Sequence, residues 1–163
     1  MRNARRISLA MLTAAAAALV LLVAPVAAGG NTQFSAIGTF DPDRLLCDEL
    51  DSLYVPVVMS GDIVGCWYTP LYTVEQSTPS GTYVETGTET FVGCLADGTT
   101  CGTFSTTYRF EGKYAPDGSE IFGRCQHPFV SGTGDFAGIT GRIDMKDDVV
   151  TPQLFVRGHY NLH

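Results

Sequence analysis

Two glutamates and one arginine are the residues of this chain whose types and spacing best suit them to chemistry. Glu85 and Glu89 lie four residues apart, on the side of a predicted strand that also carries aromatic residues. A carboxylate removed from water needs a cation, hydrogen bonds, a proton or an open cavity. Such a group can act as a general base or as an acceptor for a ligand, and Arg124 could orient an anionic or carbonyl group.

A structural role would account for the same three residues. In that alternative, Glu85 and Arg124 form an ion pair inside the fold, and Glu89 reaches solvent at its mouth. Both interpretations depend on the face that each side chain occupies, because a shift of one residue in strand pairing reverses that face.

The pairing of two predicted hairpins places these residues. If Cys94 and Cys101 face each other across a short loop, Glu85 lies opposite Phe110. One face of this hairpin is then polar, and the other is mostly aromatic and should be buried. The buried face carries Tyr83, Glu85, Glu89, Phe91, Phe104, Tyr108 and Phe110.

The next hairpin turns at Ala115–Ser119, where proline and glycine favour a three-residue loop. Tyr114 then lies opposite Glu120, and the same register carries Arg124 and Gln126 to the aromatic face. We therefore expect a shared site on three neighbouring strands. Its candidate catalytic residues are Glu85, Glu89 and Arg124, and its candidate ligand-binding residues are Tyr83, Phe91, Tyr108, Phe110 and Gln126.

Strand-like segments rich in Thr, Val, Tyr and Phe recur along the rest of the chain, separated by turn residues. About eight strands without a strong helical period indicate an antiparallel barrel or sandwich. Residues 43–51 alone look helical, with Asp43 as a possible N-cap. The predicted strands are 33–40, 53–59, 65–75, 81–94, 101–114, 119–127, 139–147 and 153–162.

Four glycines interrupt the segment 131–144 just before apolar and polar residues begin to alternate. Glycine adopts backbone angles closed to other residues and lets chains approach closely, so we expect a tight turn followed by a kinked barrel strand. A dinucleotide-binding loop is excluded, because the spacing is wrong and no helical pattern follows.

The pattern G-x-G-x-F-x-G-x-x-G at 132–141, with the alternating strand after it, resembles the glycine-rich hairpin of the allene oxide cyclase and dirigent-like barrels. The resemblance covers this segment and the count and order of strands, but not the region before Gly65. It implies an eight-stranded antiparallel, calycin-like barrel whose lumen holds one small hydrophobic molecule. The plant enzymes of this group steer cyclisation or radical coupling with carboxylates; Glu85 or Glu89 is a loose counterpart, and the rest of their pocket has none here.

The beginning of the chain has the pattern of a secretory signal peptide. Three arginines precede an apolar stretch at 7–26, and small residues follow, so we expect cleavage after Ala28 and a single barrel domain over 29–163. An uncleaved membrane anchor is the alternative. Cleavage would remove three of the ten basic residues and none of the seventeen acidic ones. The exported domain would therefore carry a formal charge of 7 − 17 = −10. We expect a secreted protein that binds no nucleic acid and has no stable membrane association after cleavage.

Five cysteines lie beyond the signal segment, where an oxidising compartment permits disulfides. Cys94 and Cys101 most simply join the two strands of their hairpin. Cys66 with Cys125 is a weaker second pairing, which would leave Cys47 unpaired or intermolecular.

We expect neither a metal nor a cofactor. His159 and His163 are too far apart along a strand to share one ion, and the acids of 41–51 do not follow an EF-hand order. His127 precedes Pro128, which we expect to end its strand, so we interpret His127 as structural. Trp67, Tyr68 and Tyr72 should pack in or near the core.

Three classes of function remain open. The first is a secreted, disulfide-stapled barrel that binds a small hydrophobic molecule in its lumen. The second is a cofactor-free isomerase or cyclase that uses a lumenal glutamate with Arg124. The third is a structural or interaction module of the cell exterior, whose barrel is filled by its own side chains.

Overall fold

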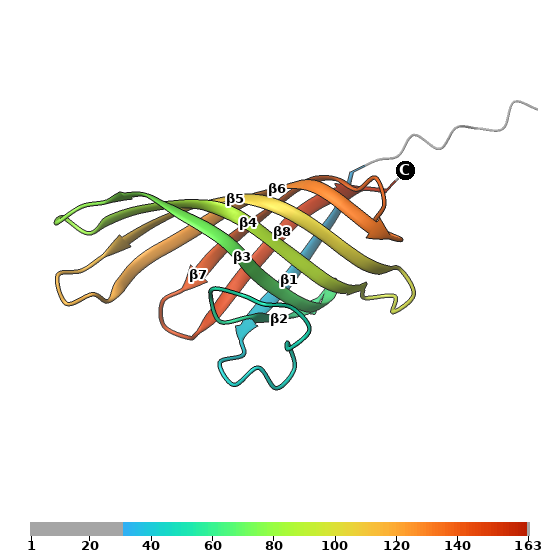
Figure 1. Ribbon diagram of the computed structural model, residues 1–163, viewed down its shortest axis with the longest axis horizontal. Helices are drawn as coiled ribbons and strands as arrows, with labels where there is room; N and C mark the ends of the chain where they lie inside the picture. The colour runs from blue at the N-terminus through green and yellow to red at the C-terminus, as the bar shows by residue number, and fades with distance from the viewer. Residues whose placement is uncertain (1–30, 163) are drawn as a thin grey trace, which may run out of the picture.

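The computed structural model describes residues 31–162, which form a closed barrel of eight antiparallel strands (Figure 1). Each strand pairs with the next along the chain, and the last strand pairs with the first. Each predicted strand has a counterpart, although residues 53–56 of the second lie in a loop. The strands are β1 Thr32–Phe40, β2 Val57–Gly61, β3 Ile63–Ser77, β4 Thr82–Leu95, β5 Cys101–Tyr114, β6 Glu120–Gly134, β7 Thr140–Asp148 and β8 Gln153–Asn161.

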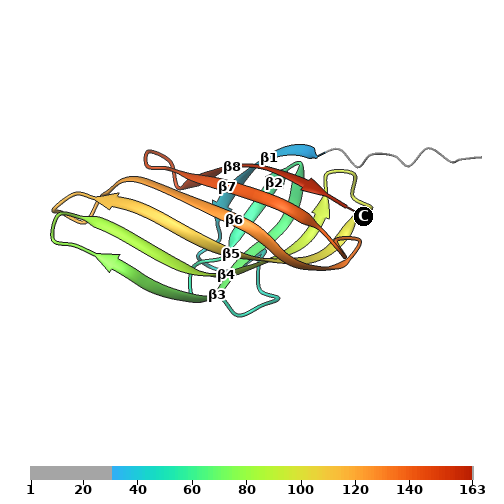
Figure 2. The same ribbon diagram turned by 90° about the horizontal axis from the view of Figure 1, so that it is seen from above.

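The two ends of the barrel differ. The hairpins β3–β4 and β5–β6 are long and project at one end, together with the β7–β8 turn (Figure 2). We call this the open end. The opposite end, which carries the β4–β5 and β6–β7 turns, is filled by apolar side chains, and we call it the closed end. Its buried residues include Ile63, Phe91, Phe104, Phe136, Ile139 and Ile143.

The predicted register of the β4–β5 hairpin is confirmed over thirteen residue pairs, from Thr82 with Lys113 to Cys94 with Cys101. The Cys94–Cys101 disulfide is present. The aromatic face predicted for this hairpin therefore points into the barrel, and it carries both glutamates inward.

The predicted register of the β5–β6 hairpin is wrong beyond its first pair. Tyr114 does lie opposite Glu120, but a β-bulge at Ile121 then brings Phe110 opposite Cys125 and Glu111 opposite Arg124. One inserted residue reverses which side chains face inward. Arg124 therefore points outward, where its side chain is 68% exposed.

Strand β6 also continues past the position where proline was expected to stop it. Pro128 lies opposite Arg142 of β7, and β6 runs on to Gly134. Proline has no N–H to donate to a neighbouring strand. The pairing of β5 with β6 is interrupted between Thr106 and Arg109, at the level of Pro128, so no β5–β6 hydrogen bond is lost there.

The glycine-rich segment forms the β6–β7 turn at the closed end, as predicted. Gly134, Gly138 and Gly141 have φ angles of 61°, 76° and 126°, which only glycine adopts without strain. Gly132 allows the returning chain to pass close by, because a Cβ there would lie 2.0 Å from the carbonyl oxygen of Phe136. Phe136 itself turns inward and is buried against the closed end.

Residues 41–56 form an irregular loop, and the helix expected at 43–51 is absent. The carboxylate of Asp41 accepts hydrogen bonds from the backbone N–H groups of Leu45, Leu46 and Cys47. A disulfide between Cys47 and Cys66 fastens this loop to β3, so the expected Cys66–Cys125 pairing is wrong.

The expected signal peptide at 1–28 lies outside the described residues. Between residues 31 and 162 the structure has no helix of the length and hydropathy needed to cross a bilayer.

Candidate functional site

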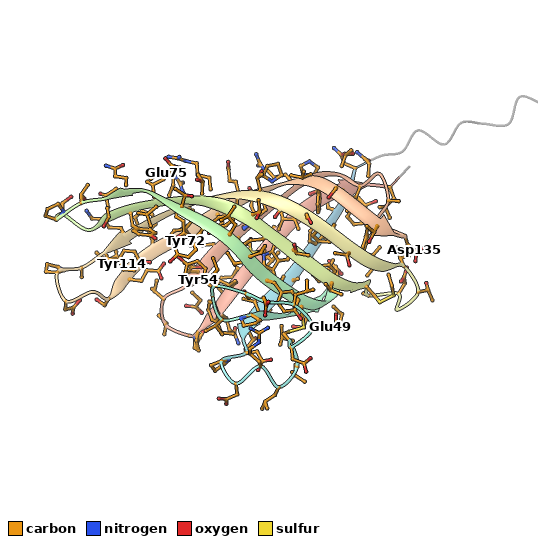
Figure 3. The ribbon with its side chains drawn as sticks, viewed as in Figure 1. Glu49, Tyr54, Tyr72, Glu75, Tyr114 and Asp135 are labelled. Atoms are coloured by element: carbon orange, nitrogen blue, oxygen red, sulfur yellow. A yellow bond between two sulfur atoms is a disulfide. The ribbon has the colours of Figure 1, made fainter. Side chains whose placement is uncertain are left out.

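A cavity of about 300 Å³ opens at the open end of the barrel. All eight strands contribute residues to its wall, and the loop 41–56 adds Tyr54 and Val55. Figure 3 shows Tyr54 on this loop beside Tyr72 of β3, and the two rings stack with centroids 4.8 Å apart. The wall combines seven aromatic residues with the four carboxyl groups of Glu85, Glu89, Glu120 and Asp147.

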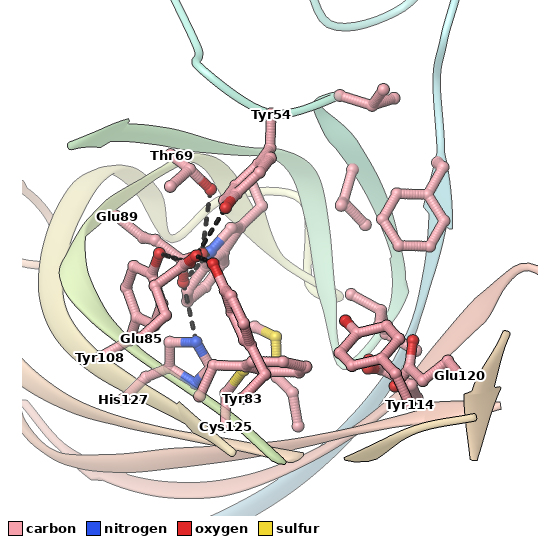
Figure 4. A pocket seen from close by; sticks show the side chains of 18 residues that line it. Tyr54, Thr69, Tyr83, Glu85, Glu89, Tyr108, Tyr114, Glu120, Cys125 and His127 are labelled. Atoms are coloured by element: carbon pink, nitrogen blue, oxygen red, sulfur yellow. Dashed lines mark hydrogen bonds and ion pairs between the residues drawn. The ribbon is translucent and has the colours of Figure 1, made fainter. Parts of the chain in front are cut away.

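Glu85 is held by three tyrosines. Its side chain projects inward from β4, and the residue is only 3% exposed. The hydroxyls of Tyr54 and Tyr83 each donate to Oε2 at 2.6 Å, and Tyr108 donates to Oε1 (Figure 4). These charge-assisted hydrogen bonds supply the partners that a buried carboxylate requires.

The same contacts keep the three phenols protonated. Burial, followed by hydrogen bonding and charge from Glu85, raises the pKa of Tyr83 to about 12. The pKa values of Tyr54 and Tyr108 are raised further by the same causes. All three hydroxyls therefore remain hydrogen-bond donors throughout the physiological pH range.

Glu89 lies deeper in the barrel, next to the closed end. Its Oε2 accepts from the indole N–H of Trp67 at 2.6 Å, and its Oε1 accepts from Thr69 at 3.0 Å. A bulge between Tyr68 and Leu71 turns Thr69 toward the glutamate, since the register of β3 shifts there. Glu89 is thus part of a buried polar network and does not reach solvent at the mouth.

His127 of β6 lies beside that network. Its side chain is 1% exposed, and Nε2 lies 2.8 Å from Oε2 of Glu89, at ion-pair distance but outside hydrogen-bond geometry. Nδ1 has no hydrogen-bond partner among the described residues. His127 therefore belongs to the cavity wall, with both ring nitrogens buried.

Cys125 lies two residues before His127 on the same inward face and is not in a disulfide. Burial raises the pKa of its thiol well above the ordinary value, with smaller contributions from the nearby carboxylates. A protonated thiol is a weak nucleophile, so this position does not favour cysteine-based catalysis.

Glu120 and Asp147 form a second acidic pair, nearer the opening. Both carboxyl groups reach over Gly123, where an added Cβ would lie 2.2 Å from Oε1 of Glu120 and 1.9 Å from Oδ2 of Asp147. Burial and the neighbouring Asp147 raise the pKa of Glu120 to about 7. In Figure 4, Glu120 and Tyr114 lie together, on the far side of the cavity from Glu85 and Glu89.

Comparisons with known proteins leave this site to be interpreted from its own geometry. No protein-family model, curated protein or solved structure matches the chain. The arrangement of carboxyl groups, phenols and imidazole in the cavity is therefore the basis of the functional conclusion.

The structure brings together five of the eight predicted site residues. Glu85, Glu89, Tyr83, Tyr108 and Phe110 all line the cavity.

Three predicted site residues lie elsewhere. Phe91 is fully buried in the closed end and stacks on Phe104, with centroids 4.7 Å apart. Arg124 and Gln126 are exposed on the outer face because of the bulge at Ile121. Arg124 pairs there with Glu111 at 2.7 Å, so the alternative of a buried Glu85–Arg124 ion pair is also wrong.

Sequence reasoning missed the residues that the bulges and the loop deliver. Tyr54, Thr69 and His127 reach the buried glutamates only because the chain departs from regular strand pairing. Glycine, proline and other turn residues between 78 and 119 identified the hairpin turns in the sequence. An extra residue within a strand has no comparable sequence signal. Between residues 31 and 162 no three His, Cys, Asp or Glu side chains meet as metal ligands.

Proposed function

We propose that this protein is a secreted barrel that binds one small molecule with an aromatic or aliphatic body in the cavity at its open end. The observation that carries this proposal is the cavity itself, about 300 Å³ with seven aromatic residues in its wall. Ligand pockets start at about this volume and combine apolar walls with a few fixed polar groups.

The polar network supports a binding role. The three phenols on Glu85 and the donors on Glu89 fix these carboxylates in place before any ligand arrives. Fixed polar groups reduce the entropy lost on binding. A lumenal isomerase that relies on Arg124 is not supported, because that side chain lies outside the barrel.

Fold type and export are part of the same proposal. The eight strands in sequential order and the glycine-rich turn between β6 and β7 support a barrel of the allene oxide cyclase type. The disulfides Cys47–Cys66 and Cys94–Cys101 support secretion, since such bonds persist in oxidising compartments.

A cavity-filling variant tests the proposal. Leu154 of β8 lines the cavity, whereas its neighbour Phe155 is exposed on the outer face. We expect the neutral fluorescent probe N-phenyl-1-naphthylamine to bind the unmodified protein and the control Phe155→Trp equally. Leu154→Trp should weaken binding by about tenfold or more, equivalent to about 1.4 kcal/mol.

Native mass spectrometry of protein purified from its own culture medium gives an independent readout if Leu154→Trp does not fold. A co-purifying small molecule would support a lumenal ligand. Probe binding that is unaffected in a folded Leu154→Trp variant, or the absence of both a co-purifying molecule and probe binding, would overturn the proposal in favour of a structural module.

A further inference from the structure

The charge of the cavity restricts what it can bind. Four carboxyl groups line it, and within residues 31–162 neither lysine nor arginine is part of its wall. The basic residues of this region are exposed or half-buried at other positions, as Arg124 illustrates. An anionic ligand would meet repulsion there without any compensating cation, because charges interact strongly where water is partly excluded.

The four carboxyl groups are not equivalent. Glu85 accepts three hydroxyl donors, and Glu89 accepts two donors while facing His127. Within residues 31–162 Glu120 and Asp147 form no ion pair with a lysine, arginine or histidine, and their oxygens converge over Gly123. Oε1 of Glu120 is buried and has no hydrogen-bond partner among the described residues.

Phe110 and Tyr114 lie close to this second pair. Tyr83 packs edge-on against Tyr114, with centroids 6.0 Å apart, and against Phe110 at 6.1 Å. All three rings line the cavity beside the acidic pair. Aromatic faces attract cations, and this attraction is strongest where water is excluded.

We propose that the ligand is a small organic cation, an amine whose ammonium group lies between Glu120 and Asp147 and whose apolar body packs against Tyr83, Phe110 and Tyr114. This inference rests on the proposed function, because it names the chemical class that the same cavity takes.

Isothermal titration with three matched probes tests the proposal at pH 8: 2-phenylethylamine, 2-phenylethanol and 3-phenylpropionate. They share one aromatic body and differ in charge. We expect the amine to bind at least about tenfold more tightly than the alcohol, and the carboxylate to bind more weakly than the alcohol.

A pair of double variants locates the effect. Glu120→Gln with Asp147→Asn should reduce the preference for the amine over the alcohol to within about twofold, while alcohol binding persists. The control removes the same charge at exposed positions, with Asp43→Asn and Asp135→Asn, and should keep the full preference. Alcohol binding serves as the readout of a correctly folded cavity in each variant.

The outcomes separate the two proposals. If none of the three probes binds and N-phenyl-1-naphthylamine also fails, the proposed function itself is overturned. Equal binding of amine and alcohol, or tighter binding of the carboxylate, overturns the cation proposal and leaves lumenal binding in place. Displacement of the amine by calcium ions alone would make the acidic pair a metal site and would equally overturn it.

Discussion

The closed and open ends of this barrel are built from the same strands but differ in what lies between them. At the closed end, Phe91, Phe104 and Phe136 fill the interior with stacked and edge-to-face rings. At the open end the same inward faces carry Glu85 and Glu120, and a cavity remains. Apolar packing stabilises one end, whereas the other keeps costly polar groups in fixed positions. Such a division separates the packed core from the proposed binding cavity along the barrel axis.

The largest effect should come from truncating a ring at the closed end. Phe104→Ala removes a buried ring that contacts Trp67, Phe91 and Phe136, so we expect a loss of about 3–5 kcal/mol in the free energy of unfolding. Phe110→Ala at the open end should cost about 1 kcal/mol, since that ring is half-buried beside a cavity. Urea unfolding measures both, and equal losses would contradict the division between the two ends.

The two disulfides sharpen the comparison, because one fastens the loop 41–56 to β3 and the other joins β4 to β5 at the closed end. Replacing Cys47 and Cys66 by alanine opens a loop with a sequence separation of 19, and replacing Cys94 and Cys101 opens one of 7. We expect losses of about 3 and about 2.5 kcal/mol, from the entropy of the unfolded chain.

Only one of these changes should affect binding. The Cys47–Cys66 bond fastens the loop that brings Tyr54 to Glu85, so its loss should weaken binding of N-phenyl-1-naphthylamine, while loss of Cys94–Cys101 should not. The opposite order in a fluorescence titration would place the binding site at the closed end.

A smaller effect is expected at the tyrosines of Glu85. Tyr108→Phe removes a buried donor to a carboxylate and should cost about 2 kcal/mol in urea unfolding. Tyr83→Phe removes a donor to the same carboxylate from a half-buried position, so we expect about half that loss. A stabilising Tyr108→Phe would show that the network is not held together as its geometry indicates.

The smallest effect is a pH dependence at the acidic pair. The pKa of Glu120 rises from 4.5 to about 7 on folding, through burial and the nearby Asp147. The folded protein therefore binds this proton more tightly than the unfolded chain, and the carboxyl lowers stability as the pH rises through that range. Glu120→Gln should raise the free energy of unfolding at pH 8 by about 1 kcal/mol, given solvent screening, and by nothing at pH 4.

Asp148, on the same strand as Asp147, provides a control of opposite sign. Hydrogen bonds from Thr151 and the backbone of Val150 lower the pKa of Asp148. Asp148→Asn should therefore lower the melting temperature at pH 7 and have less effect below that pKa. Burial raises the pKa values of Tyr114 and Cys125 near the acidic pair, and a pH effect above neutrality that persists in Glu120→Gln would be assigned to them.

The β4–β5 hairpin was predictable because two local signals agree. Cys94 and Cys101 define one end of its register, and strict alternation along both strands keeps the aromatic residues on one face. The same reasoning placed Glu85 and Glu89 inside the barrel. The prediction that Arg124 points inward was wrong because of the bulge at Ile121. Isoleucine and phenylalanine are ordinary strand residues, so the sequence there does not indicate an extra residue.

The loop 41–56 was beyond sequence reasoning for a different reason. Its order comes from contacts between residues distant in the chain, such as the hydrogen bond from Tyr54 to Glu85, 31 positions apart. Local propensity favoured a helical turn near Asp43, but the Asp41 carboxylate and the Cys47–Cys66 bond stabilise an irregular path instead.

The sequence by itself determined the number and order of strands, the inward direction of two glutamates and one disulfide. These follow from alternation and turn residues, which act over a few positions. Only the tertiary structure decided which groups contact those glutamates. It also decided that no lysine or arginine within residues 31–162 lines the cavity. Barrel closure joins strands far apart in the chain, and a single bulge is enough to exchange Arg124 for Cys125 at the inner wall.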